Sequence, residues 1–196
     1  EDCLRRPGAR IVIDDGRRFL ERTSQRFDLV VIDPPPPIEA AASSLLYSQE
    51  FYRAAKRRLR AGGILQQWFP EGDFETLVAI VRALQAEFRF VRGFRSCEGT
   101  GVHFLASDEP LAGVSAGALA RRLPPAAAAD LVEWGPEATP ERELELVLRR
   151  EVRLDFSSVA PGVPPMTDDR PVNEYFLLRR FRAGAPGNGS QPRSAR

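Results

Sequence analysis

The stretch that most constrains the fold is an apolar run that ends at one carboxylate and is followed by prolines. Residues Leu29 to Ile32 are all apolar, and three of the four are β-branched. Such a run is typical of a strand buried on both faces of a parallel sheet. Asp33 follows, and then four prolines, which cannot donate to a strand ladder, so the strand must end there. Ligands of open α/β sheets bind at the carboxyl ends of strands, which makes Asp33 a candidate functional residue. The alternative is a solvated acid at a plain strand end.

The spacing of apolar residues predicts alternating strands and helices on both sides of this run. We expect strands at residues 10–13, 64–69, 88–94 and 102–106, and helices at residues 17–23, 48–60 and from Asp73 onward. Gly62-Gly63 is expected to end the second helix, and the last two strands are expected to form an antiparallel hairpin. This alternation predicts an α/β fold with a parallel, doubly wound sheet and right-handed crossovers.

Asp15 and Gly16 follow the first predicted strand and precede the first predicted helix. Glycine permits a tight turn or a close approach of a ligand to the backbone. Asp15 can serve equally well as an ordinary helix cap. His103, the only histidine, has no accompanying base or nucleophile pattern, so we predict a structural or surface role for it.

Composition excludes several classes of function. The chain has 196 residues, is 43% hydrophobic and 28% charged, and has a net charge of +1, which gives no case for a nucleic-acid partner. Cys3 and Cys97 are too few and too far apart for a metal site or a disulfide framework, and no metal is expected. No apolar run approaches the roughly 18 residues of a membrane helix. The chain begins at Glu1 rather than Met, and we expect it to be a piece of something longer.

The second half of the sequence has a different character. Short helices are predicted at residues 115–122 and 125–131, and a third begins with Thr139 as cap and runs to about Glu151. We therefore divide the chain into residues 1–110, a partial enzyme-like domain; residues 111–182, a helical C-terminal extension; and residues 183–196, a disordered tail.

Four blocks of residues together resemble the spermidine/spermine synthase (polyamine aminopropyltransferase) family. They occur in the family's order and spacing, at residues 13–20, 28–33 with Pro37, 46–52 and 62–65. The segment Thr167-Asp168-Asp169-Arg170-Pro171 further resembles the tail of a bacterial branch in which a multi-span membrane region is fused to a synthase-like domain.

The resemblance implies a fold, a reaction and site residues. The fold is the class I S-adenosylmethionine methyltransferase-like Rossmann fold, here partial, because its first strands, glycine-rich loop and ribose-binding acid are absent from this chain. Asp15 and Gly16 match the family's contact with the adenine of the nucleoside cofactor, and Asp33 and Pro34 are also matched to the cofactor site. Asp33 matches the candidate base beside the attacking amine. The cofactor would be decarboxylated S-adenosylmethionine or S-adenosylmethionine itself, consumed as a substrate, and the reaction would be alkyl (aminopropyl) transfer to a small-molecule amine.

Departures from the family pattern leave alternatives open. Pro36 stands where the family has a second acid that grips the diamine, and Gln67 falls near the position of a family glutamine. We therefore predict poor use of putrescine, unless Glu39, Glu50 or Glu71 compensates. A methyltransferase acting on another acceptor and a non-catalytic domain that regulates a membrane partner are the alternatives. The predicted location is cytoplasmic, with tethering to the inner membrane by an upstream segment and assembly as a homodimer both left open.

Overall fold

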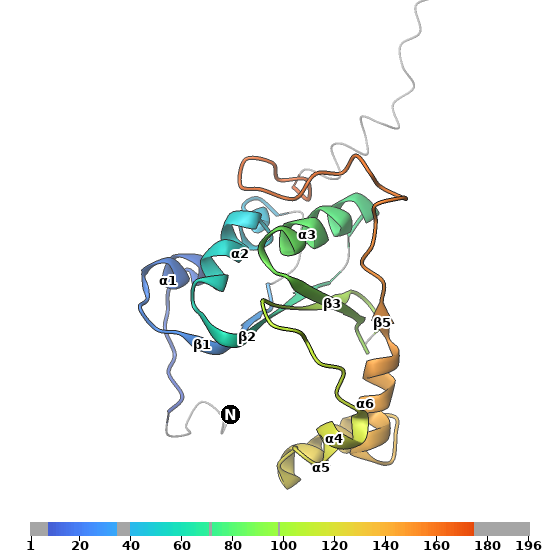
Figure 1. The fold of residues 1–196 in the computed structure, drawn as a ribbon. Coiled ribbons are helices and arrows are strands. Elements are labelled where there is room, and N and C mark those ends of the chain that lie inside the picture. Colours follow the sequence, from blue (N-terminus) through green and yellow to red (C-terminus); the bar gives the residue numbers. More distant parts are fainter. Residues whose placement is uncertain (1–7, 35–39, 71, 98, 175–196) are drawn as a thin grey trace, which may run out of the picture.

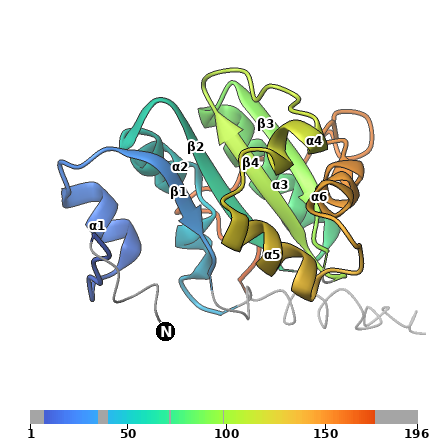
Figure 2. The same cartoon turned by 90° about the horizontal axis from the view of Figure 1, so that it is seen from below.

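The computed structural model describes residues 8–34, 40–70, 72–97 and 99–174, which form an open mixed sheet with helices on both faces (Figure 1, Figure 2). The strands are β1 (Phe27–Ile32), β2 (Leu59–Phe69), β3 (Phe90–Arg95), β4 (Val102–Ser107) and β5 (Glu151–Val152). The helices are α1 (Gly16–Arg22), α2 (Gln49–Lys56), α3 (Phe74–Glu87), α4 (Ala116–Ala120), α5 (Pro125–Trp134) and α6 (Pro140–Arg149), with a short 3-10 helix, η2 (Ser43–Leu46).

The sheet has the strand order β1-β2-β4-β3-β5, so β1 lies at one edge. β1 and β2 are parallel, with Val30 opposite Leu65 and Ile32 opposite Gln67, and the other three pairings are antiparallel. Helices α2 and α3 cover one face of the sheet, and α4, α5 and α6 lie on the other, toward β3 and β5 (Figure 1, Figure 2). Because β1 and β2 run in the same direction, the residue after β1 comes to lie beside the end of β2.

The core lies between the sheet and the layer formed by α2 and α3. The predicted apolar face of α3 is confirmed, because Ile80, Val81 and Leu84 are all fully buried and Leu77 packs against them. Asp73 caps this helix as predicted, accepting a hydrogen bond of 2.9 Å from the Thr76 N–H. Side chains from α2 and from the inner face of the sheet complete the core: Phe51, Tyr52, Leu65 and Phe104.

The predicted strand at residues 10–13 is wrong. None of the strand pairings includes these residues, and Ile11 and Ile13 are 66% and 99% exposed. A strand exists only where a neighbouring strand accepts and donates its backbone hydrogen bonds. Within the described part of the chain, nothing pairs with this segment, so its β-branched residues do not by themselves produce a strand.

The prediction that the Leu29–Ile32 strand is buried on both faces is also wrong. Ile32 is buried, but Leu29 and Val31 are 53% and 58% exposed. In the strand they alternate with Val30 and Ile32, which face the core, and α4, α5 and α6 lie toward the opposite edge of the sheet, near β3 and β5 (Figure 1). The run is therefore an edge strand with one covered face. The described helices leave the apolar residues of its other face exposed.

The predicted helix at residues 48–60 is shorter than expected, and Gly62-Gly63 does not end it. Helix α2 stops at Lys56, and β2 begins at Leu59 and runs through both glycines. The register between β1 and β2 shifts here, since Phe27 faces Leu59 whereas Leu29 faces Ile64. A φ of +70° at Gly62 accommodates the irregular strand start, so the glycines serve a bulge rather than a helix terminus.

The remaining predicted elements are confirmed with small changes of boundary. β3 and β4 form the antiparallel hairpin, and Thr139 caps α6 ahead of Pro140. Residues 183–196 lie outside the described residues, as do Pro36 and Pro37. Among the helices that the structure describes, none has both the length and the apolar character of a membrane span.

Candidate active site

Asp33 follows the carboxyl end of β1 and is exposed to solvent. Within the described part of the chain, no hydrogen bond or ion pair engages its carboxylate. Its charge is felt by Tyr47, whose pKa is raised mainly by burial of the hydroxyl and additionally by the negative charge of Asp33. Asp33 is thus an accessible acid whose oxygens are available to a ligand.

Asp15 has the capping role that we had considered as its alternative function. Its Oδ1 accepts a hydrogen bond of 2.8 Å from the Arg18 N–H at the start of α1. The second oxygen, Oδ2, has no protein partner among the described residues. A Cβ added to Gly16 would meet nothing within 4 Å, so the space above this backbone is open. The cap therefore leaves Oδ2 accessible, so capping does not exclude the predicted ligand contact.

One cavity joins all the predicted site residues. Its volume is about 450 Å³, and it runs along β1 beneath α1. Asp15, Gly16, Asp33 and Pro34 line it together with apolar side chains that include Leu46 and Phe51. The cavity therefore combines an apolar wall with two carboxylates, a combination that suits a flat heterocycle with hydrogen-bonding groups at its edge.

A second cavity lies on the other side of Asp33. Its volume is about 600 Å³, and Gln66, Trp68, His103 and Phe94 are among the residues that line it. Asp33 also lines this cavity, and it is the only described residue common to the two sets of lining residues. The acid thus stands at the boundary between two separate spaces.

The wall of this second cavity is built by register across β2 and β4. Trp68 faces His103 in the antiparallel pairing, and the two rings stack at 6.4 Å with an angle of 20° between them. Gln66 Nε2 lies 3.0 Å from His103 Nδ1. An aromatic face of this kind can accept an ammonium group by a cation–π contact. Our prediction of a structural or surface role for His103 did not anticipate its place beside Asp33.

Two buried polar side chains near the cavities, Gln67 and Tyr47, differ in their hydrogen bonds. Gln67, which the resemblance placed near a family glutamine, is fully buried and accepts a hydrogen bond of 2.5 Å from the Tyr52 hydroxyl. Its Nε2 donates to the Leu46 carbonyl at 3.0 Å, so both ends of the amide are engaged. The Tyr47 hydroxyl, by contrast, is buried without a partner among the described residues. Sequence reasoning missed Tyr47 because a tyrosine within an apolar run carries no functional signal.

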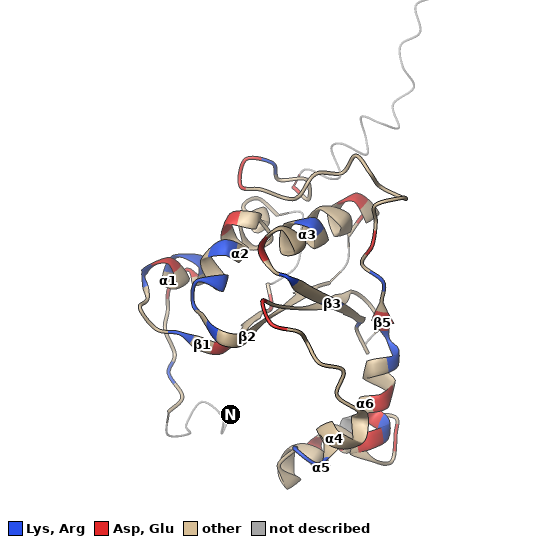
Figure 3. Ribbon diagram, viewed as in Figure 1, with Lys and Arg blue, Asp and Glu red and all other residues tan. Residues whose placement is uncertain are grey.

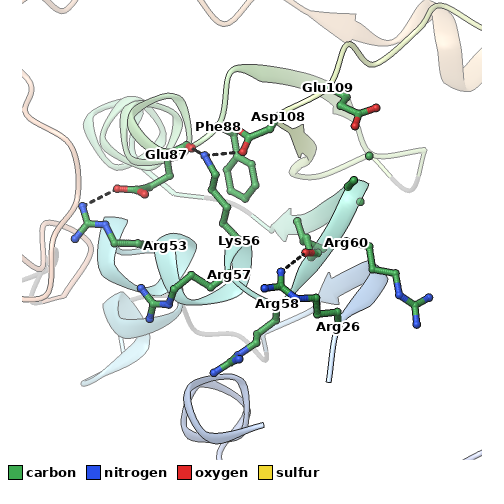
Figure 4. A pocket seen from close by; sticks show the side chains of 14 residues that line it. Arg26, Arg53, Lys56, Arg57, Arg58, Arg60, Glu87, Phe88, Asp108 and Glu109 are labelled. Atoms are coloured by element: carbon green, nitrogen blue, oxygen red, sulfur yellow. Dashed lines mark hydrogen bonds and ion pairs between the residues drawn. The ribbon is translucent and has the colours of Figure 1, made fainter. Parts of the chain in front are cut away.

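A third cavity lies elsewhere and has a structural explanation. Its volume is about 730 Å³, it opens where β2 begins, and six basic side chains line it: Arg26, Arg53, Lys56, Arg57, Arg58 and Arg60 (Figure 3, Figure 4). Arg58 donates to the carbonyls of Leu20 and Glu21 at the end of α1. Lys56 donates to the Glu87 carbonyl at the end of α3. Cations at helix C-termini offset unpaired carbonyls, so most of this cluster stabilises the fold.

Of the acids considered as substitutes for the missing family carboxylate, only Glu50 is among the described residues, and it does not line the second cavity. Glu50 Oε2 accepts a hydrogen bond from the Asp168 N–H, and Glu39 and Glu71 lie outside the described residues. Among the described residues that line the second cavity, Asp33 is the only acid. No group of three or more His, Cys, Asp or Glu side chains among the residues in the structure is arranged to hold a metal ion.

Comparison with known proteins finds a family whose domain resembles the first part of the chain. Residues 4–87 match the model of the spermine/spermidine synthase domain. In these residues, the chain is similar to the spermine/spermidine synthase family. The matched segment contains α1, β1, α2 and most of α3, and hence Asp15, Gly16, Asp33 and Pro34.

Individual family members show how far the similarity extends. The chain is 36% identical over 85 residues to a polyamine aminopropyltransferase of Sulfurisphaera tokodaii, covering 43% of this chain and 28% of that protein. It is 30% identical over 93 residues to polyamine aminopropyltransferase 2 of Pseudomonas aeruginosa, covering 46% of this chain and 27% of that protein. The chain therefore spans under a third of the length of these two family members.

A solved structure extends the similarity of fold beyond the matched segment. A probable spermidine synthase from Corynebacterium glutamicum superposes with a TM-score of 0.53 at 16% identity, covering 83% of this chain and 56% of that one. The predicted class I methyltransferase-like fold is confirmed at this level. The membrane-fused branch, the division into domains, the homodimer and membrane tethering stay predictions.

Proposed function

We propose that the protein transfers an aminopropyl group from decarboxylated S-adenosylmethionine to a small amine. The observation that carries this proposal is the position of Asp33 as the one described residue that lines both cavities. A group transfer between two substrates needs a donor space and an acceptor space that meet at the reacting atoms. The similarity of residues 4–87 to the spermine/spermidine synthase domain supports this chemistry.

The first cavity is assigned to the nucleoside of the donor. The free Oδ2 of Asp15 can accept a hydrogen bond from the exocyclic amino group of adenine. The open space above Gly16 lets the base approach the backbone, and the apolar side chains of the cavity contact its faces. Asp33 and Pro34 would then lie toward the sulfonium end of the donor.

The second cavity is assigned to the amine. The amine arrives as an ammonium, and Asp33 accepts its proton, which then passes to solvent. The nitrogen lone pair forms a bond to the carbon next to sulfur, and the electrons of the broken carbon–sulfur bond neutralise the sulfonium. The products are the alkylated amine and 5′-methylthioadenosine. Trp68 provides a face on which the rest of the amine can lie.

The composition of this cavity favours an acceptor with one ammonium rather than two. A second buried ammonium would need its own carboxylate, because an unpaired buried charge is costly. Asp33 is the only acid among the described residues that line the cavity, and Arg95 adds a positive charge. We therefore propose that putrescine is a poor acceptor and that a monoamine, or an amine with a neutral polar end, is preferred.

The decisive experiment supplies the complete protein with decarboxylated S-adenosylmethionine and a panel of mono- and diamines, and follows release of 5′-methylthioadenosine. We expect turnover that falls about 10²–10⁴-fold in Asp33→Asn, the usual contribution of a general base. Asp28→Asn is the matched control, since Asp28 lies on the same strand but is exposed and paired with Arg60 at 2.6 Å. This control should retain full activity.

The panel also decides between acceptors and between donors. We expect kcat/KM for putrescine to lie about 100-fold below that of the best monoamine, as an unpaired buried charge implies. A preference for putrescine would contradict the acceptor assignment. Turnover with S-adenosylmethionine but not with its decarboxylated form would establish the methyltransferase alternative. Absence of turnover with either donor would leave the non-catalytic alternative.

A further inference from the structure

The segment of residues 166–174, here called the strap, crosses from α3 to the front of α2. Met166 is fully buried, its N–H donates to the Ala79 carbonyl at 3.0 Å, and its carbonyl accepts from the Gln49 N–H at 2.9 Å. The strap therefore begins as a backbone connection between the middle of α3 and the first turn of α2. It contains the Thr167–Pro171 motif that the function has not so far explained.

The centre of the strap forms a two-pronged ion pair with α1. The two terminal nitrogens of the Arg17 guanidinium donate to Asp168, Nη1 at 2.8 Å to Oδ1 and Nη2 at 2.7 Å to Oδ2, across a sequence separation of 151 residues. The Asp168 N–H donates to Glu50 Oε2 at 3.1 Å. Arg17 also donates to the Leu45 carbonyl at 3.3 Å. Parallel charge-assisted hydrogen bonds of this kind fix both partners in one orientation.

The end of the strap holds η2. Glu174 Oε1 accepts from the Ser44 hydroxyl at 2.6 Å, and the Asn173 amide donates to the Ser43 hydroxyl at 2.7 Å. Asn173 and Glu174 are 1% and 8% exposed, so these contacts are shielded from water. The strap thus fixes the turn that leads into Leu46, one wall of the nucleoside cavity.

The two elements that the strap holds are the two sides of that cavity. Arg17 follows directly after Asp15 and Gly16 on one side, and Leu46 ends η2 on the other. We propose that Asp168 is a positioning residue, which sets the separation of these two walls through Arg17 and thereby the binding of the donor nucleoside. This inference rests on the proposed function for its ligand, while the contacts themselves do not.

The experiment compares Asp168→Asn with Asp169→Asn. Asp169 is the neighbouring acid, but it is exposed, and its one hydrogen bond to a described residue comes from the Thr167 hydroxyl within the strap, at 2.6 Å. Hydrogen exchange should show the amides of residues 16–22 and 43–51 exchanging about tenfold faster in Asp168→Asn, as expected for the loss of a charge-assisted pair. Amides of β3 and β4 should be unchanged, and Asp169→Asn should behave as the unsubstituted protein.

The KM for each substrate distinguishes a positioning role from a general loss of stability. We expect Asp168→Asn to raise KM for decarboxylated S-adenosylmethionine by about 10–100-fold, the effect of a small misplacement, with a much smaller change in kcat and in KM for the amine. Arg17→Gln removes the same pair from the other side together with the contact to the Leu45 carbonyl, so the double variant should be no worse than Arg17→Gln alone. Arg17→Gln also serves as the test variant if Asp168→Asn fails to fold.

The outcomes separate this inference from the proposed function. Equal exchange in Asp168→Asn and Asp169→Asn, or an increase spread evenly over the whole sheet, overturns the positioning role whatever the activity. Equal increases in KM for both substrates overturn it as well. If the unsubstituted protein shows no turnover, the proposed function fails while the exchange comparison still decides whether the strap holds the two walls.

Discussion

At the scale of single residues, two buried tyrosines contrast sharply. Tyr47 and Tyr52 both have no exposed surface. The Tyr52 hydroxyl donates to Gln67, whereas the Tyr47 hydroxyl lacks a partner among the described residues and senses the charge of Asp33. A buried hydroxyl without a partner costs stability, so its presence next to the site suggests a functional use.

Replacing each tyrosine by phenylalanine tests this contrast. Tyr52→Phe leaves Gln67 Oε1 buried without its donor, so the free energy of unfolding should fall by about 1–3 kcal/mol. Tyr47→Phe removes an unpaired group, so the free energy of unfolding should stay within about 0.5 kcal/mol or rise. Urea unfolding measures both. Equal losses in the two variants would show that Tyr47 has a stabilising partner that we have not recognised.

The individual site residues were predictable to different degrees. Asp33 and Asp15 could be found because each follows an apolar run, and each lines the first cavity. Trp68 and His103 could not, because their pairing depends on the register of β2 against β4, which no local pattern specifies. For Asp15, the cap and the predicted ligand contact looked like competing roles, but the cap uses Oδ1 alone and leaves Oδ2 without a partner among the described residues.

At the scale of elements, the hairpin of β3 and β4 depends on the glycines in its turn. Gly99 and Gly101 both have positive φ, +101° and +84°. A Cβ at Gly99 would meet nothing within 4 Å, but at Gly101 it would lie 2.4 Å from the carbonyl oxygens of Phe69 and Pro70. Only Gly101 therefore combines an unusual backbone conformation with a close approach of two segments.

Alanine at these two positions should separate the cost of a positive φ from the cost of a steric clash with the Phe69–Pro70 backbone. Gly99→Ala should cost about 1–2 kcal/mol of unfolding free energy, the price of a left-handed conformation for an L-residue. Gly101→Ala should cost about 1–3 kcal/mol more, because the end of β2 must move. Thermal or urea unfolding of the two variants gives the comparison. If Gly101→Ala is as stable as Gly99→Ala, the Phe69–Pro70 backbone can shift without a measurable loss of unfolding free energy.

Element boundaries failed where local signals were ambiguous. Helix α3, with a cap and a periodic apolar face, was predicted correctly, since both signals lie within the segment itself. Gly62-Gly63 carried a signal that fits a helix end and a strand bulge equally, and the pairing of β1 with β2 decided the matter. The segment at residues 10–13 has the composition of a strand but no pairing partner among the described residues.

At the scale of the whole molecule, several carboxylates tie distant segments together and make stability depend on pH. The pKa of Asp168 is lowered chiefly by its hydrogen bond from Arg17, and that of Glu151 chiefly by its hydrogen bond from Arg92. A carboxylate with a depressed pKa stabilises the fold above its unfolded value, and this contribution is lost as the pH falls through the folded value.

We therefore expect the free energy of unfolding to change little from about pH 7 to pH 5 and to decline below about pH 4, near the ordinary values of Asp and Glu. Urea unfolding at a series of pH values measures this profile. In Asp168→Asn the acid decline should be shallower, because one of the contributing groups no longer titrates. A variant with an unchanged acid slope, or a protein that gains stability toward low pH, would contradict this reading.

The strap also affects the order in which the chain can form its contacts during synthesis. Arg17 and Asp168 are 151 residues apart, so at a synthesis rate of about 5–20 residues per second, roughly 8–30 seconds separate the appearance of the two partners. During that interval, α1 and η2 exist without the contacts that later hold them. The cavity along β1 therefore gains this contact only after Asp168 has been synthesised, and a product interrupted before residue 166 would lack the ion pair that holds α1.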